Sequence, residues 1–129
     1  MNDLAAPGVT PPDQLAQALR DLRAKDLDAR RAAVDVLEAL QALPELIETM
    51  QDNEHWFVRM AAAQALGRLG DTRAIPFLAQ VLYEHYTRDP WFAFDAAVAL
   101  AQIGTPEALA VLRAFRRERR WGMGDGVMR

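Results

Sequence analysis

The sequence predicts an all-α fold, a short right-handed α-solenoid of about three helix pairs with a capping helix at its N-terminal end. Hydrophobic residues make up 51% of the 129-residue chain. Ala and Leu dominate over Val, Ile and Thr, which favours helices over strands. A segment recurs along the chain at a fixed spacing, which is typical of stacked helix pairs.

The N-terminal end is expected to hold a flexible lead over residues 1–12 and a capping helix over residues 13–25. Pro and Gly punctuate the lead, and Thr10 or a neighbour starts the helix, whose first turn tolerates proline. The apolar residues of the capping helix fall at the spacing of a single buried stripe: Leu15, Ala18, Leu19 and Leu22.

Three copies of one unit make up the rest of the chain. The clearest copy covers residues 58–78. When this copy is shifted by 34 residues, the separation of Ala63 and Ala97, eight of its residues fall on similar residues. A third copy, with weaker similarity, lies upstream. We therefore expect a repeat domain over 13–120 with repeats at about 27–52, 54–86 and 89–120, followed by a flexible tail over 121–129.

Each unit carries signals for where its helices begin and end. Gly70 and Gly104 follow first helices, where glycine adopts the left-handed conformation without a side-chain clash. Thr105 and Pro106 then provide an N-cap hydroxyl and a proline suited to the first turn of the next helix. Asp89 before Pro90 does the same at the start of the third pair.

The clearest copy resembles the HEAT-like repeat of phycobilisome lyases. The resemblance rests on its Ala-Leu-Gly-x-Leu-Gly-Asp and Ala-Ile-Pro-x-Leu elements, between Val58 and Leu78, and covers about residues 27–116. It implies a superhelix of helix pairs. Such repeats occur in lyases, hydroxylases, DNA glycosylases and scaffolds, so the resemblance predicts the fold and does not by itself imply an activity.

Two Glu-His pairs invite comparison with the deoxyhypusine hydroxylases, a HEAT-like group that binds two irons through His-Glu pairs at helix starts. The resemblance would give that role to Glu54-His55 and Glu84-His85. The order of the two residues is reversed here, and aligned repeats place His55 opposite Asp89 and not opposite His85. We therefore interpret both histidines as loop residues beside aromatics and expect no metal ligands.

Composition excludes several further classes of function. The chain has no cysteine, which excludes disulfides, thiolate catalysis and Cys-based zinc sites. No Ser-His-Asp set, phosphate loop or pair of catalytic carboxylates can be assembled from the spacing. No apolar run approaches the ~18 residues of a membrane helix, and no signal peptide is apparent. We predict a cytoplasmic, non-enzymatic protein with no catalytic residues and no cofactor.

The second helix of each pair is expected to line a concave face. Residues pointing away from the buried stripe include Glu45 and Glu48 in the first pair, and Phe77, Gln80 and Glu84 in the second. This face is acidic at one end, which would suit a protein partner with a basic or amphipathic helical segment. An ordinary solvated helix face is the competing interpretation.

Aromatic residues mark the entrance to successive repeats. Trp56 and Trp91 occupy equivalent positions, and Tyr83 lies close in sequence. Such residues are enriched at interface hot spots, so this aromatic rim could anchor a partner. The alternative is structural, with the neighbouring Phe57 and Phe92 filling gaps between repeats.

The charge distribution is split between an acidic body and a basic end. Residues 1–112 carry nine basic and sixteen acidic groups, whereas residues 113–129 carry six and two. Four arginines of this end could grip a phosphate backbone: Arg113, Arg116, Arg117 and Arg120. They could equally form a solvated cap at a helix C-terminus. The acidic body favours the cap and disfavours nucleic acid as the partner.

The leading functional hypothesis from sequence is a non-enzymatic protein-interaction or scaffold module that uses the concave face and the aromatic rim. One alternative is an accessory or regulatory subunit of a phycobilin lyase-type or other enzyme complex. The other is nucleic-acid binding through the Arg-rich end. Three repeats are near the lower limit for independent stability, so self-association is compatible with the sequence, which leaves the oligomeric state open.

Overall fold

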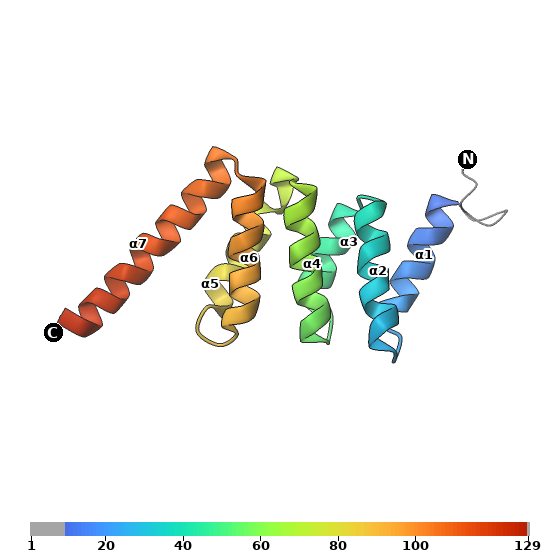
Figure 1. Ribbon diagram of the computed structural model, residues 1–129, viewed down its shortest axis with the longest axis horizontal. Coiled ribbons are helices and arrows are strands. Elements are labelled where there is room, and N and C mark those ends of the chain that lie inside the picture. The colour runs from blue at the N-terminus through green and yellow to red at the C-terminus, as the bar shows by residue number, and fades with distance from the viewer. Residues whose placement is uncertain (1–9, 129) are drawn as a thin grey trace. The chain divides into compact units, whose positions relative to one another are not determined.

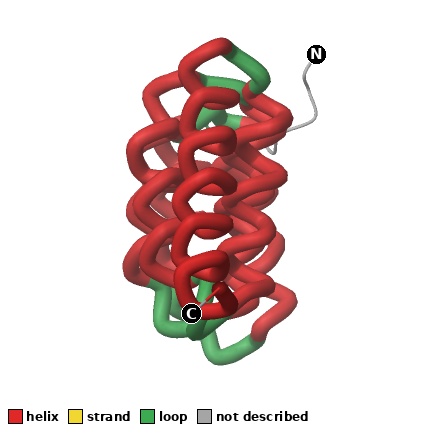
Figure 2. The backbone as a smooth tube through the Cα atoms, turned by 90° about the vertical axis from the view of Figure 1, so that its left-hand side faces the viewer, coloured by secondary structure: helices red, strands yellow, loops and turns green. Residues whose placement is uncertain are grey.

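A computed structural model describes the backbone of residues 10–128 and the side chains of residues 10–119. Seven α-helices and one 3-10 helix make up this part of the chain, which contains no strand (Figures 1 and 2). The prediction of an all-α fold of HEAT-like helix pairs with a preceding helix is confirmed. Residues 1–9, most of the predicted flexible lead, lie outside the described residues.

The chain divides into two compact units, one ending at Ala65 and one beginning at Leu66. The first unit contains α1 (Pro11–Asp21), α2 (Leu27–Ala39), α3 (Leu43–Asp52) and the start of α4 (Trp56–Leu69). The second contains the end of α4, η1 (Thr72–Ala74), α5 (Ile75–His85), α6 (Pro90–Ile103) and α7 (Pro106–Met128).

Helix α1 has Thr10 as its N-cap and runs from Pro11 to Asp21, whereas the capping helix was expected over residues 13–25. The Thr10 side chain accepts a hydrogen bond from the Asp13 amide, and the Asp13 carboxylate accepts one from the Thr10 amide, which forms a capping box. Ala18 and Leu22 are buried as expected, but Leu19 is 40% exposed. The predicted stripe was too wide there, because Leu19 lies on the wall of an open groove described below.

Helix α2 packs against both α1 and α3, so it forms the centre of the first unit. Its Val34 and Leu37 meet a core that includes Leu46 and Met50 of α3. Gln41, in the turn between α2 and α3, has a φ of 53°, the left-handed region. The first repeat copy therefore has a non-glycine residue in the left-handed conformation that glycine adopts at the corresponding turns of the other two copies.

The second unit uses the helix ends that the sequence predicts. Gly70 and Gly104 both have positive φ values, 69° and 68°. The Asp89 carboxylate accepts a hydrogen bond from the Phe92 amide at 3.2 Å, and the Thr105 hydroxyl accepts one from the Ala108 amide at 3.2 Å. These caps satisfy amide groups that the first turns of α6 and α7 leave without a partner.

A close approach of α4 and α6 organises the core of the second unit. A Cβ placed on Gly67 would lie 2.7 Å from the Ala99 Cα and 2.2 Å from the Gln102 Oε1. Only glycine fits at this crossing. Helix α5 packs on the same α6 from within this unit and buries Leu78 and Leu82.

Helix α7 is longer than the sequence predicts, because it continues to Met128. The segment 121–129, expected to be a tail, is thus helical as far as Met128, and its flexibility stays a prediction. Among the described residues, no helix is both long and apolar enough to span a membrane.

Candidate functional site

Two of the predicted partner-binding residues, Glu45 and Glu48, line a groove between α1 and α3 of the first unit. Its volume is about 260 Å³. The lining consists of Leu19, Leu22, Arg23, Glu45, Glu48, Thr49, Asp52 and Asn53. We call it the α1–α3 groove.

The α1–α3 groove is acidic along α3 and apolar along α1. Glu45, Glu48 and Asp52 are spaced at i, i+3 and i+7, which places their carboxylates on one side of the helix. Arg23 is the one cationic residue of the lining, and Leu19 and Leu22 form the apolar wall. A groove of this kind suits a side chain with a long hydrocarbon stem and a cationic end.

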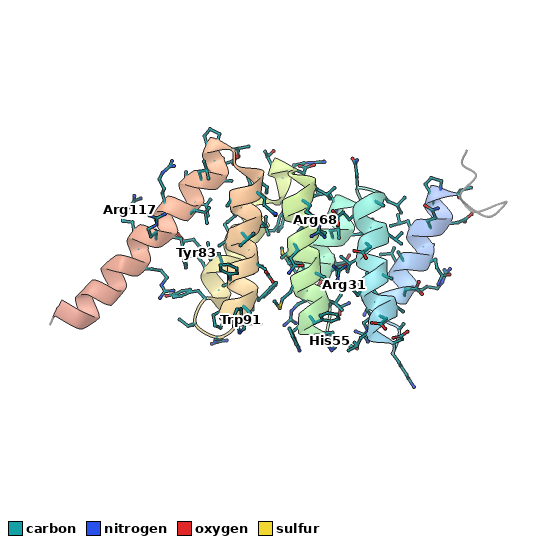
Figure 3. All side chains as sticks on the ribbon, in the orientation of Figure 1. Arg31, His55, Arg68, Tyr83, Trp91 and Arg117 are labelled. Carbon is teal, nitrogen blue, oxygen red and sulfur yellow. The ribbon has the colours of Figure 1, made fainter. Side chains whose placement is uncertain are left out.

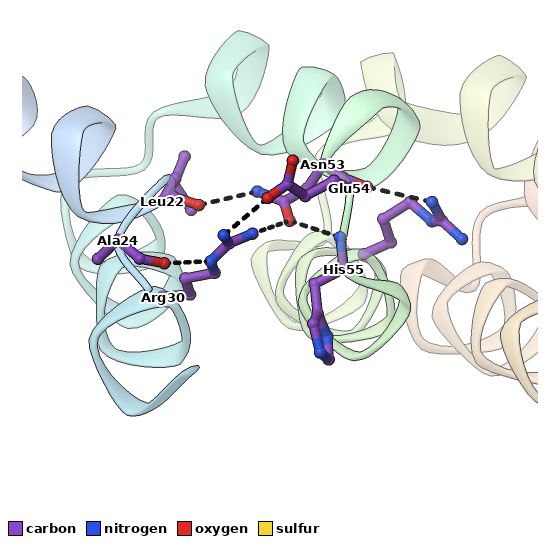
Figure 4. A network of polar contacts seen from close by, with 7 residues as sticks. Leu22, Ala24, Arg30, Asn53, Glu54 and His55 are labelled. Atoms are coloured by element: carbon purple, nitrogen blue, oxygen red, sulfur yellow. Dashed lines mark hydrogen bonds and ion pairs between the residues drawn. The ribbon is translucent and has the colours of Figure 1, made fainter. Parts of the chain in front are cut away.

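Asn53 lines the groove, and its side chain bonds to the chain on both sides of it (Figure 4). Its Nδ2 donates a hydrogen bond to the Leu22 carbonyl at 3.2 Å, and its Oδ1 accepts one from the His55 amide at 3.0 Å. The side chain is only 9% exposed. Residues 31 positions apart are thereby held together at one polar contact.

Arg30 supports this joint from α2. It is 7% exposed, and its Nε donates to the Ala24 carbonyl at 2.6 Å, while one terminal nitrogen reaches the Glu54 carboxylate at 2.8 Å. The hydrogen bond and the charge of Arg30 lower the pKa of Glu54. A second terminal nitrogen of Arg30 makes a long bond of 3.4 Å to Asn53.

The sequence did not predict this network. Arg30 and Arg59 occupy matching positions of two repeat copies, and Arg59 also donates to the α3–α4 connection, to the Asn53 carbonyl at 3.1 Å. The recurrence of arginine at this repeat position was the one sequence feature that could have indicated the network. Asn53 gave none, because its partners lie far away in sequence.

The two histidines lie in different units, each beside aromatic rings. His55 stands at the start of α4 in the first unit, with its ring stacked on Trp56 and edge-on to Phe57 (Figure 3). Its Nδ1 is buried and makes no hydrogen bond to any described residue. His85 belongs to the second unit, edge-on to Phe92. Within residues 10–119, no group of three His, Asp or Glu side chains gathers that could hold a metal ion.

The predicted residues of α5 belong to the second unit. Phe77 is half-buried, and Gln80 donates a hydrogen bond to the Glu84 carboxylate at 2.9 Å. Tyr83 is 38% exposed and meets Phe115 of α7 edge-on. Since each unit is described by itself, a single concave face joining α3 and α5 stays a prediction.

The aromatic pairs divide into exposed and buried members. Trp56 is 57% exposed and Trp91 is 73% exposed, at the first turn of α6 (Figure 3). Phe92 lies in the core and Phe57 is half-buried. Phe92 is thus a core residue, while a binding role for the tryptophans stays a prediction.

Arginines of α7 differ in their surroundings. Arg113, Arg116 and Arg117 are exposed, and the side chain of Arg120 lies outside the described residues. Arg119, which the sequence did not single out, is half-buried over the ring of Tyr86.

A larger groove lies between α1 and α2, with a volume of about 800 Å³. Alanines make up much of its lining, and the charges of Asp13 and Asp21 flank that of Arg20. None of the predicted site residues lies there. The smaller α1–α3 groove remains the candidate site because it concentrates one sign of charge.

Comparison with known proteins decides the family. Residues 12–89 match the profile described as HEAT repeats, and residues 93–116 match the PBS lyase HEAT-like repeat. The first match alone covers more than half of the chain. The chain belongs to the HEAT-repeat family.

Two curated relatives of this HEAT-repeat protein are named deoxyhypusine hydroxylase. The relative from Homo sapiens is 31% identical over 105 residues, which cover 80% of this chain and 34% of the relative. The relative from Mus musculus is 42% identical over 53 residues, 41% of this chain and 17% of the relative. The chain thus spans about a third of the length of the human protein.

These relatives overturn the hypothesis of a non-enzymatic interaction or scaffold module. Both carry the name of an enzyme, and this finding contradicts the non-enzymatic scaffold interpretation, which is wrong. The error has a physical origin. Alanine and leucine periodicity reports how helices pack, and the packing pattern is shared by HEAT-repeat enzymes and by HEAT-repeat scaffolds alike.

Proposed function

We propose that this HEAT-repeat chain is part of an enzyme of the deoxyhypusine hydroxylase kind, and that its α1–α3 groove binds a cationic side chain of the polypeptide substrate. The observation that carries the proposal is the row of three carboxylates on α3 beside an apolar wall. The likeness to the human hydroxylase extends over 80% of the chain.

The chemistry of the named substrate matches the lining. Deoxyhypusine is an amino acid with a long amine-bearing side chain, and alkyl amines of this type are protonated near neutral pH. Its hydrocarbon stem would lie along Leu19 and Leu22, and its ammonium groups would face Glu45, Glu48 and Asp52. Burying the stem and pairing the charges act together, as they do for lysine at protein surfaces.

The proposal narrows the predicted partner, a basic or amphipathic helical segment, to a polypeptide that carries such a side chain. Substrate binding is assigned to the groove, and no oxidation step is assigned to the described residues. The predicted cytoplasmic location is retained as part of the proposal.

A peptide titration tests the proposal. One probe is a short peptide with a single deoxyhypusine residue among glycines, and its matched control carries norleucine at that position. We expect the first to bind and the second to bind far more weakly. Chemical-shift changes in an NMR titration should fall on amides of α1 and α3.

Charge-removing variants identify the residues responsible. Glu48→Gln and Asp52→Asn should each weaken binding by about 2–5-fold, because each removes one partly solvated ion pair. Glu107→Gln removes the same charge from the exposed first turn of α7 and should leave the affinity unchanged. Equal binding of the two peptides, or an equal loss in the Glu107 variant, would contradict the proposal.

A further inference from the structure

Helix α6 of the second unit carries an apolar stripe on its exposed side. The stripe consists of Trp91, Phe94, Val98 and Ala101, whose spacing of i, i+3, i+7 and i+10 places them along one face of the helix. Trp91 is 73% exposed, Phe94 61% and Val98 37%, and Ala101 is exposed as well. We call these four residues the α6 stripe.

The equivalent face of α2 in the first repeat carries charges instead. The buried residues Leu37 and Leu100 occupy matching positions of the two repeat copies and align α2 with α6. This alignment places the α6 stripe on four charged residues: Asp28, Arg31, Asp35 and Glu38. Charged side chains are typical of a helix face that stays in water. An exposed apolar stripe at the same positions therefore indicates a surface that another molecule covers.

We propose that the α6 stripe is a homodimer interface, in which α6 of a second copy packs antiparallel on α6 of the first. The stripe is bulky in its N-terminal half and small in its C-terminal half. A two-fold interface uses the same patch twice, so antiparallel packing sets large residues against small ones. One register places Phe94 opposite Ala101 of the second copy. The same register places Trp91 opposite the exposed Gly104, which has no side chain to obstruct the indole.

The charges at the two ends of the α6 stripe fit the same orientation. Arg88 precedes α6, Glu107 lies beyond its other end in the first turn of α7, and both residues are exposed. The register described above brings Arg88 of each copy towards Glu107 of the other, whereas parallel packing would bring like charges together. Exposed ion pairs of this kind contribute little affinity, but they favour one orientation over the other.

The area of the α6 stripe is enough for a weak dimer. At their exposures, the rings of Trp91 and Phe94 present about 200–300 Å² per chain. Two copies, with Val98 and the flanking atoms, would bury about 1,000 Å², near the lower limit for a specific interface. We therefore expect a dissociation constant of about 1–100 µM. The inference goes beyond the proposed function and uses no residue of the α1–α3 groove.

Sedimentation equilibrium of the full chain tests the proposal. The native chain should show a monomer–dimer equilibrium in this concentration range. Val98→Glu should weaken the dimer at least about tenfold, because the symmetric interface would bury two unpaired carboxylates. Val36→Glu is the matched control, since Val36 is a valine of α2 with 36% exposure against 37% for Val98, and it should leave the dimer unchanged. Circular dichroism should show the same helix content in all three chains.

Disulfide trapping tests the register. The chain has no cysteine, so Val98→Cys introduces a single thiol, which the proposed register places beside its own counterpart near the two-fold axis. Mild oxidation should convert this variant to a covalent dimer, because the two thiols lie within the reach of a disulfide, and should leave Val36→Cys mostly monomeric. The proposal is overturned if the native chain stays monomeric throughout, if Val98→Glu self-associates as the native chain does, or if both cysteine variants crosslink at the same rate.

Discussion

Removing the Asn53 side chain should destabilise the first unit far more than its small size suggests. In Asn53→Ala, the Leu22 carbonyl loses a bond of 3.2 Å and the His55 amide one of 3.0 Å. Each buried backbone group left without its partner costs about 1–3 kcal/mol. The Arg30 contact at 3.4 Å is too long to add much. We expect a loss of about 2–4 kcal/mol in the free energy of unfolding.

Urea unfolding followed by circular dichroism measures this loss, and hydrogen exchange of the α1 amides locates it. Asp52→Ala is the control, because Asp52 is the exposed neighbour of Asn53 and surface changes of this kind fall within about 0.5 kcal/mol. If both variants unfold at the same urea concentration, Asn53 does not hold α1 to the α3–α4 connection and the reasoning fails.

Three further predictions test other features. Gly67→Ala should lower stability by about 1–2 kcal/mol despite its better helix propensity, because the new Cβ meets the backbone of Ala99; an unchanged urea midpoint would argue against this close crossing. Gln41→Gly should raise stability by about 0.5–1 kcal/mol, since it relieves a left-handed φ just after α2, and a lower midpoint would contradict the strain. The pKa of Asp71 is lowered from 3.8 to about 2 by hydrogen bonds from Arg73, so its contribution to stability is complete above pH 3.8 and is lost as the pH falls towards 2. NMR titration of the Asp71 carboxyl should show this low value in the wild type and a rise in Arg73→Gln.

The fold was predictable because its signals are local and repeated. Glycines at 70 and 104 and the caps at Asp89 and Thr105 act on residues no more than four positions away. Periodic alanines and leucines predicted the helix pairs for the same reason. The exposure of Leu19 was not predicted, because the spacing of apolar residues cannot distinguish a buried stripe from the wall of an open groove.

The candidate site was predictable only in part. Glu45 and Glu48 were identified from their direction on α3, yet the groove they line depends on α1, whose position no local pattern specifies. The bond from Asn53 to Leu22 spans 31 positions and leaves no periodic trace. The similarity to proteins named as enzymes could not be predicted from the helical pattern, because residues that pack helices together do not specify a reaction.

The joint at Asn53 also has a mechanical consequence. The Asn53 amide joins the C-cap residues of α1 and α3 beside the α1–α3 groove, and α2 packs on both helices, so the walls are in place before any ligand arrives. A ligand entering such a preset slot loses less free energy to ordering than one that must draw the helices together. Lengthening the Asn53 side chain by one methylene, as in Asn53→Gln, would act as a wedge between these two helix ends.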